Sequence, residues 1–133
     1  MTAADEPVWL LKEAVLLAHA RSLAQHGGPQ GLRDDGMLES ALARPQQLYA
    51  YGDPPPDLAA MAAAYAFGIA KNHPFVDGNK RTSLIALGGF LRINGFRLTA
   101  DQVAAYQAII ALAEGSMTEK MLAAWVRQHM EPR

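Results

Sequence analysis

The sequence predicts an all-α fold, a bundle of about six helices with one central loop. Apolar residues recur at helical spacing, and Gly, Pro and Asn separate the apolar segments. Asp, Ser and Thr stand at several positions where a helix would begin. At 133 residues the chain has the size of one domain, so we expect residues 1–133 to form a single unit with a buried core.

The first predicted helix follows a short lead over residues 8–10, which we expect to be extended. Its pattern covers residues 11–25. One face of this helix carries small and apolar residues, namely Leu11, Ala14, Val15, Ala18 and Ser22. His19 lies near that face, so we interpret it as a structural histidine with satisfied hydrogen bonds and not as a ligand. Gly27-Gly28-Pro29 ends the helix, because glycine and proline favour turns.

Asp34 is placed to cap a second helix, because its side chain can accept a hydrogen bond from a free N–H group of the first turn. We expect this helix to run to about Arg44. Pro45 follows, and proline cannot donate the backbone hydrogen bond that continues a helix. Residues 46–57 include three successive prolines, which predicts the longest irregular stretch of the chain.

Two helices are predicted in the centre of the chain. Asp57 caps an alanine-rich helix that leads to His73. After a short loop, another helix begins near Asn79 and ends at Asn94-Gly95, a pair of residues that is typical of a helix C-terminus. The loop between these two helices is therefore short and central.

The last part of the chain predicts two more helices after a short connector over residues 96–98. Two pairs of residues fit capping boxes: Thr99 with Gln102, and Ser116 with Glu119. We expect the helices that they open to run to about Glu114 and about His129.

Residues 73–82, His-Pro-Phe-Val-Asp-Gly-Asn-Lys-Arg-Thr, form the most informative segment of the chain. They place a titratable ring, a carboxylate, a Gly-Asn turn and two cations in one loop between apolar helices. A helix that begins near Asn79 directs its free backbone N–H groups and the positive end of its dipole at this loop. The sequence therefore predicts an anion site, and phosphate is the usual anion there.

His73, Phe75 and Asp77 are candidates for a base, a loop anchor and a metal ligand. Imidazole gains and loses a proton near neutral pH, so His73 can accept the proton of a hydroxyl that attacks phosphorus. Phe75 is interpreted as the apolar side chain that holds the loop against the bundle. Asp77 can hold Mg²⁺, because water and phosphate oxygens supply the other ligands of this ion. It is equally placed to act as the helix N-cap, and both roles stay open.

Residues 78–81 are candidates for phosphate or nucleotide binding. Gly78 lets the backbone approach an anion closely, and the N–H groups of Gly78 and Asn79 can face that anion. Lys80 and Arg81 place positive charge at a helix N-terminus, which costs stability because it opposes the helix dipole. That cost favours phosphate binding over a plain surface position, more strongly for Arg81 than for Lys80.

The loop resembles the signature of the Fic/Doc family, His-x-Phe-x-Asp/Glu-Gly-Asn-x-Arg. The fixed places of this signature are filled by His73, Phe75, Asp77, Gly78, Asn79 and Arg81. Members that transfer AMP usually have Gly where this chain has Lys80. Asn-Lys-Arg-Thr is similar to the death-on-curing (Doc) branch, the toxins of toxin–antitoxin pairs. The resemblance extends over about residues 9–126.

The resemblance implies a Fic/Doc fold and a toxin that blocks translation by transferring phosphate from ATP to a protein hydroxyl, a threonine of elongation factor Tu. In the family the residue at the place of His73 is the base, and the residue at the place of Asp77 holds Mg²⁺. Two alternatives stay open. One is AMP transfer (AMPylation), against which only Lys80 argues. The other is a non-catalytic module that binds a nucleotide or an antitoxin, against which the intact His73 counts.

The resemblance also bears on partners. Some members block their own site with a helix that carries Ser/Thr-x-x-x-Glu, but the residue four places before Glu114 is Ile110. We therefore expect a separate antitoxin chain, a disordered segment that folds on binding. In the family the segment before the central helix covers the target, so Tyr49 and Tyr51 are either packing residues or residues that dock the substrate.

Composition excludes several classes of function. The net charge of −1 gives no general attraction to nucleic acid or to an anionic membrane. The absence of cysteine excludes disulfides, thiolate catalysis and Cys-type zinc sites, and it fits a reducing cytoplasm. The N-terminus lacks the cationic start of a signal peptide, and no apolar run approaches the roughly 20 residues of a membrane helix. We expect a cytoplasmic protein.

Overall fold

The computed structural model describes residues 6–133, and within them it confirms the predicted all-α fold. The helices are α1 (Lys12–His26), α2 (Asp35–Tyr51), α3 (Leu58–Asn72), α4 (Asn79–Ile93), α5 (Gln102–Glu114) and α6 (Glu119–Gln128). Two short strands, β1 (Phe96–Leu98) and β2 (Met130–Pro132), complete the secondary structure of the described residues. Within this range, no helix is both long enough and apolar enough to cross a membrane.

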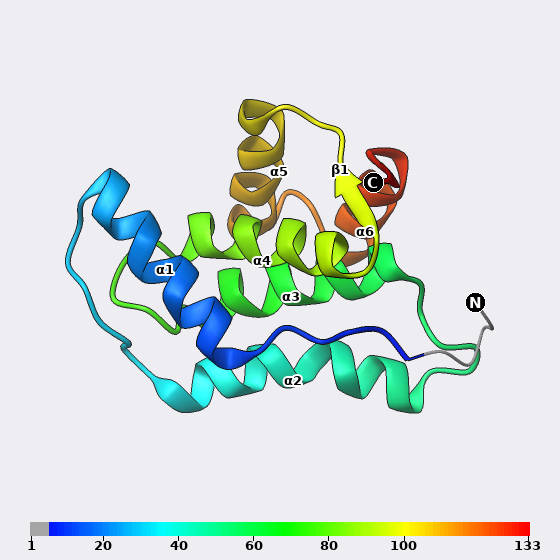
Figure 1. Cartoon of the computed structure of the whole chain (residues 1–133), viewed down its shortest axis with the longest axis horizontal. Coiled ribbons are helices and arrows are strands. Elements are labelled where there is room, and N and C mark those ends of the chain that lie inside the picture. The colour runs from blue at the N-terminus through cyan, green and yellow to red at the C-terminus, as the bar shows by residue number, and fades with distance from the viewer. Residues whose placement is uncertain (1–5) are drawn as a thin grey trace.

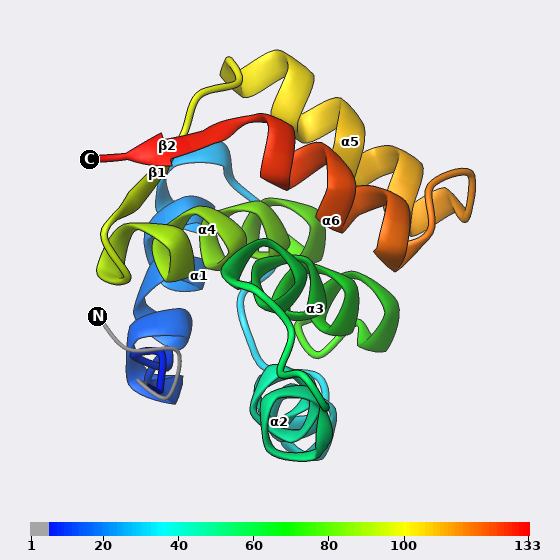
Figure 2. The same ribbon diagram turned by 90° about the vertical axis from the view of Figure 1, so that its right-hand side faces the viewer.

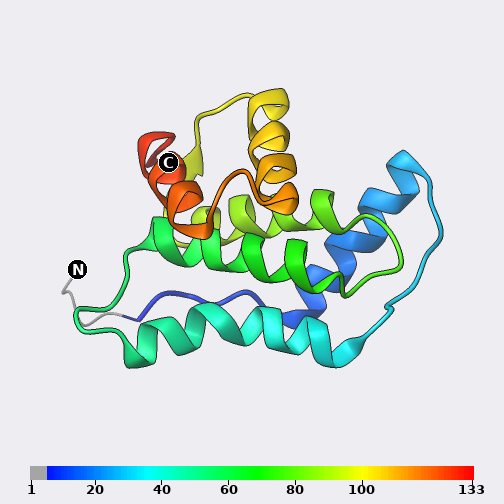
Figure 3. The same cartoon turned by 180° about the vertical axis from the view of Figure 1, so that it is seen from behind.

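The helices form layers around α3 and α4, which lie side by side at the centre (Figures 1 and 2). The helices α1 and α2 cover one side of this pair, while α5 and α6 cover the other (Figure 2). The loop between α3 and α4 lies at one end of the molecule, beside the loop between α1 and α2 (Figures 1 and 3). The predicted site is therefore held between segments from both halves of the chain.

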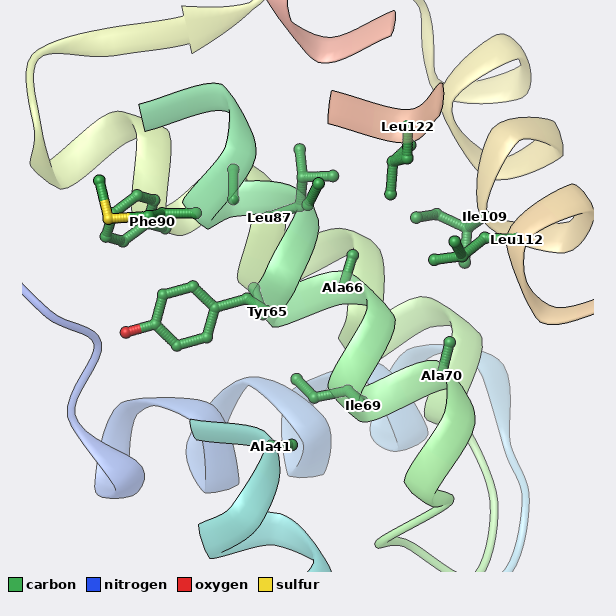
Figure 4. Packing of buried hydrophobic residues seen from close by; sticks show 14 of the residues in the cluster. Ala41, Tyr65, Ala66, Ile69, Ala70, Leu87, Phe90, Ile109, Leu112 and Leu122 are labelled. Carbon is green, nitrogen blue, oxygen red and sulfur yellow. The ribbon is translucent and has the colours of Figure 1, made fainter. Parts of the chain in front are cut away.

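The core is built around α3, which is buried along almost its whole length (Figure 4). It contacts α2, α4, α5 and α6, so its side chains must be small where neighbours approach closely. At Gly68 an added Cβ would lie 2.9 Å from Cα of Ala41, a distance that excludes any side chain. Larger side chains such as Tyr65 fill the remaining space, and the Tyr65 hydroxyl accepts the N–H of Leu10 at 3.1 Å, which fixes the N-terminal lead. Burial raises the pKa of this hydroxyl.

The second helix is longer than predicted, because Pro45 lies inside α2 and does not end it. Proline costs α2 one backbone hydrogen bond, to the carbonyl of Ala41. Pro45 is buried, and Tyr49 on the added turn packs edge-on against Trp9 with ring centroids 5.8 Å apart. Tertiary packing thus outweighs the lost bond, and the irregular stretch begins only at Gly52.

Residues 96–98 are a strand, β1, and not a simple connector. They pair antiparallel with β2, which follows α6, so that Arg97 lies opposite Glu131 and forms an ion pair with it. The pairing continues where the N–H of Thr99 donates to the carbonyl of His129 at 2.6 Å. The partner strand lies more than thirty residues away, which is why a local pattern could not predict it.

Two of the predicted N-caps are confirmed. Asp34 accepts the N–H of Met37 at 3.0 Å, and Asp57 accepts the N–H of Ala60 at 2.9 Å. Asp57 also receives two hydrogen bonds from Arg127 of α6, at 2.7 and 3.0 Å. These bonds hold the pKa of the Asp57 carboxyl below its usual value and join the start of α3 to α6.

The two predicted capping boxes are wrong. The side chains that cap α5 and α6 are those of Asp101 and Thr118, each two residues after the predicted cap. Both helices end within one residue of the predicted position.

The predicted inner face of α1 is only partly buried, because Leu11 and Ala14 are exposed. This helix packs mainly on α4 and leaves one side in solvent.

The neighbouring hydroxyls of Thr82 and Ser83 predict opposite effects on stability. Both side chains are buried, but Oγ1 of Thr82 has no hydrogen-bond partner among the described residues, whereas Ser83 Oγ donates to the carbonyl of Ala66 at 2.7 Å. Thr82→Val should leave the free energy of unfolding unchanged or raise it by up to about 1 kcal/mol, because a buried unpaired hydroxyl is unfavourable. Ser83→Ala should lower it by about 1 kcal/mol. Urea denaturation of both variants measures these changes, and an equal loss in both would contradict the prediction.

Candidate active site

A pocket of about 370 Å³ opens over the loop between α3 and α4. The loop and the start of α4 supply His73 and residues 76–81 to its lining. The other walls come from α1, from Gly27 and from Tyr106 of α5. The fold thus brings His73, Asp77 and residues 78–81 to one pocket, while Phe75 lies outside its lining.

His73 stands at the C-terminus of α3 in the left-handed conformation, with φ 49° and ψ 54°. Among the described residues it is the only non-glycine residue with a positive φ. Its N–H donates to the carbonyl of Ile69 at 3.3 Å, and its side chain is exposed at the pocket. The left-handed turn ends the helix and directs the chain into the loop. This conformation costs free energy for a residue with a Cβ. Such strained backbone conformations often occur at functional sites.

Phe75 and Asn79 close the loop on itself. Both are buried, and the Asn79 side chain bonds Phe75 twice: its Nδ2 donates to the Phe75 carbonyl at 2.9 Å, and its Oδ1 accepts the Phe75 N–H at 3.0 Å. The amide oxygen and nitrogen are therefore both engaged inside the protein. Any direct contribution of Asn79 to anion binding must come chiefly from its backbone N–H.

His19 supports this loop from α1. It is buried, its ring stacks on Phe75 with centroids 3.7 Å apart, and its Nε2 donates to the carbonyl of Asp77 at 2.7 Å. As predicted, it is a structural histidine with a hydrogen-bond partner. It joins α1 to the loop at two points.

Asp77 is not the side-chain cap of α4. The N-cap of this helix is Gly78, with φ 80°, and no side chain bonds the first turn there. Asp77 Oδ1 instead accepts the N–H of Gly78 at 2.8 Å. Its Oδ2 lies so close to Gly28 that a Cβ added there would come within 2.5 Å of it. Gly28 therefore leaves the space that the exposed carboxylate occupies.

The surroundings of Asp77 fit one class of cation. Within residues 6–133 no group of three His, Cys, Asp or Glu side chains could hold a metal ion. A cation at Asp77 would therefore take most of its ligands from water and from phosphate oxygens. Mg²⁺ binds in this way, through one or two carboxylates and the phosphates of a substrate.

The start of α4 supplies backbone donors. The first bond of this helix runs from the N–H of Thr82 to the carbonyl of Gly78 at 3.0 Å. The N–H groups of residues 79–81 precede that bond and stand at the pocket, together with the positive end of the helix dipole. This is the arrangement that binds phosphate at helix N-termini.

Lys80 and Arg81 add positive charge that no carboxylate of the described residues neutralises. The guanidinium of Arg81 lies over the ring of Tyr106, with 5.3 Å between Cζ and the ring centroid. Its NH1 lies 3.4 Å from Nε2 of His26. His26 and Tyr106 were not predicted as pocket residues, because they come from α1 and α5 and belong to no local motif.

Tyr49 and Tyr51 do not belong to this site. Tyr49 packs against Trp9, as described above, and Tyr51 is exposed at the C-terminal end of α2. That end of α2 lies at the opposite side of the molecule from the loop between α3 and α4 (Figure 1). The structure gives no support to a docking role for these two tyrosines.

Comparisons with known proteins identify the family of this chain. The model of the Fic/DOC family matches residues 9–91, which include α1, the loop and most of α4. The protein "Toxin Doc" of Mycolicibacterium smegmatis is 44% identical over 93 residues, which is 70% of this chain and 69% of that protein. "Protein kinase doc" of Escherichia phage P1 is 35% identical over 86 residues, or 65% of this chain and 68% of that protein. The chain therefore belongs to the Fic/Doc family.

Proposed function

We propose that this protein transfers phosphate from ATP to a hydroxyl group of another protein. The observation that carries the proposal is the convergence of an exposed imidazole, a carboxylate and the N-terminus of α4 on one pocket. Each part answers one need of phosphoryl transfer: a base, a cation ligand and fixed donors for phosphate oxygens. The kinase named among the relatives supports the same reaction.

In this mechanism His73 removes the proton of the acceptor hydroxyl as its oxygen attacks the γ-phosphorus. The bond from phosphorus to the β,γ-bridging oxygen breaks, and ADP leaves. The N–H groups of residues 79–81 and the side chains of Lys80 and Arg81 hold the phosphates and stabilise the charge that develops on them. Asp77 would hold Mg²⁺, which supplies further neutralisation of that charge.

The biological role that we propose is that of a toxin controlled by a separate antitoxin chain. One relative is named a toxin, which supports this role. The target proposed from the family resemblance is a threonine of elongation factor Tu, whose modification would block translation. An antitoxin that covers the pocket would keep both the nucleotide and this target from it.

The test uses ATP labelled either on the γ-phosphate or on the α-phosphate, with Mg²⁺ and elongation factor Tu as acceptor. Phosphate transfer labels the acceptor from the γ-position only. Labelling from the α-position would replace the proposal with AMP transfer. If ATP binds and neither label is transferred to this factor or to proteins of a cell extract, the protein is a binding module and the catalytic proposal fails.

Substitution of His73 should abolish transfer and leave the fold intact. Asn is the sharper replacement, because it tolerates the left-handed conformation, whereas Ala adds a strain of about 1 kcal/mol. We expect His73→Ala and His73→Asn both to lose phosphate transfer. His73→Asn should also keep the melting temperature of the parent. Initial rates and thermal melts test this. A His73→Asn variant that transfers phosphate at the parental rate would remove His73 from the mechanism.

Asp77→Asn should weaken ATP binding only when Mg²⁺ is present. The amide keeps the shape of the side chain but loses the negative charge that attracts the cation. We expect affinity to fall about tenfold with Mg²⁺, equivalent to about 1.4 kcal/mol, and to stay unchanged in a chelator. Calorimetry measures both. Asp53→Asn removes the same charge beyond the end of α2 and is the control, so equal losses in the two variants would contradict a metal role.

Lys80 should decide which phosphorus is attacked. Glycine at this position would leave space for the α-phosphate to lie deep in the loop, whereas lysine fills that space and adds positive charge. We expect Lys80→Gly to lose labelling from the γ-position and to gain labelling from the α-position. The double-label assay described above measures both activities. An unchanged pattern of labels would show that Lys80 does not select the reaction.

A further inference from the structure

Arg33 holds the turn in which His73 stands. Its side chain donates two hydrogen bonds to the last carbonyls of α3: Nε to the carbonyl of His73 at 2.6 Å, and NH2 to the carbonyl of Asn72 at 2.8 Å. Carbonyls at a helix C-terminus lack partners inside the helix, and a cation there is favoured by the helix dipole. The guanidinium fork spans two successive carbonyls, one of them that of His73 itself.

The backbone around Arg33 is bonded to the same turn. The N–H groups of Arg33 and Asp34 both donate to the carbonyl of Pro74, at 2.7 and 3.0 Å. The N–H of Val76 donates to the carbonyl of Gly31 at 3.0 Å, and Leu32 and Phe75 form an antiparallel bridge. Residues 31–34 therefore lie along residues 73–76 and fix the backbone on the C-terminal side of His73.

The contacts of Arg33 are directed at the protein and not at the pocket. It is not among the residues that line the pocket, and it forms no ion pair with a carboxylate of the described residues. Its side-chain hydrogen bonds go to the two carbonyls at the end of α3. The positive charge of Arg33 therefore faces the backbone carbonyls of Asn72 and His73 and not the pocket in which a nucleotide would bind.

The conformation of His73 explains why such support is needed. His73 is held in a left-handed conformation that is costly for any residue with a Cβ, and its imidazole is exposed. Its N–H bond to Ile69 at 3.3 Å is longer than the two bonds from Arg33. If the turn relaxed towards a common conformation, the ring would leave its place at the pocket wall.

We infer that Arg33 is a positioning residue for the base, which acts on the reaction only through the backbone of His73. This inference rests on the proposed role of His73. Arg33 fixes the direction in which the imidazole meets the acceptor hydroxyl, whereas the phosphates are held by α4. Loss of Arg33 should thus slow the transfer step without weakening nucleotide binding.

The test compares Arg33→Met and Arg33→Lys with a matched control, Arg127→Met. Methionine keeps much of the apolar stem and loses both hydrogen bonds, while lysine keeps the charge and loses the fork geometry. Arg127 also makes two side-chain bonds to an end of α3, but at the N-terminal end, through Asp57. The measurements are melting temperature, ATP affinity by calorimetry, kcat and KM of transfer, and the ¹⁵N NMR signals of the His73 imidazole.

For Arg33→Met we expect kcat to fall roughly 10- to 100-fold, the range that a misplaced catalytic group produces. ATP affinity should stay within about threefold of the parent, and the His73 ring signals should shift or broaden. Arg33→Lys should recover part of kcat. Arg127→Met should lower the melting temperature by a similar amount but keep the parental kcat and the parental His73 signals.

Three results would overturn the inference. The first is an equal kcat in Arg33→Met and Arg127→Met. The second is a parallel loss of ATP affinity in Arg33→Met, which would mean that Arg33 supports the whole loop. The third is failure of both Arg33 variants to fold. If the parent itself transfers nothing, the proposed function fails, but the His73 signals in Arg33→Met still decide whether Arg33 positions that ring.

Discussion

The burial of α3 on all sides governs how the other helices and the central loop are arranged. Four helices contact it, and its alanines and Gly68 allow them to approach closely. Because α3 packs along α4, the C-terminus of α3 lies close to the start of α4. The loop that joins the two helices is held in place by this packing, and its residues line the pocket.

Hydrogen bonds and ring stacking hold the loop, and the Arg33 guanidinium contributes two of these bonds, to the carbonyls of Asn72 and His73. The Asn79 amide bonds Phe75, the ring of His19 stacks on Phe75, and His19 bonds the Asp77 carbonyl. Lys80 and Arg81 are in no ion pair within residues 6–133, so no carboxylate of these residues neutralises their charge. The residues that keep the shape of the site and those that would act on a substrate are thus largely different residues, which allows mutations to separate stability from activity.

Positive charge at the start of α4 opposes the helix dipole, which lowers the stability of the protein. Contacts with other parts of the fold offset this loss of stability only in part. The Arg81 guanidinium lies over the ring of Tyr106, which stabilises a cation without neutralising it, and its NH1 lies 3.4 Å from Nε2 of His26. A phosphate would neutralise it and would accept the free N–H groups of the first turn as well. An anion bound there would therefore offset the cost of placing these cations at the helix N-terminus.

Features whose physical causes are local could be predicted from the amino-acid sequence. The loop residues 73–82, the caps Asp34 and Asp57, and the end of α4 at Asn94-Gly95 were all predictable, because a cap or a turn depends on a few adjacent residues. Four features could be known only from the folded chain: the passage of α2 through Pro45, the pairing of β1 with β2, the role of the Asn79 amide and the contact of Arg33 with His73. Pro45, β1 and Arg33 depend on partners that are distant in the sequence and that only the folded chain brings near. The Asn79 amide bonds Phe75 only four residues away, but the burial of both side chains is set by the packing around the loop.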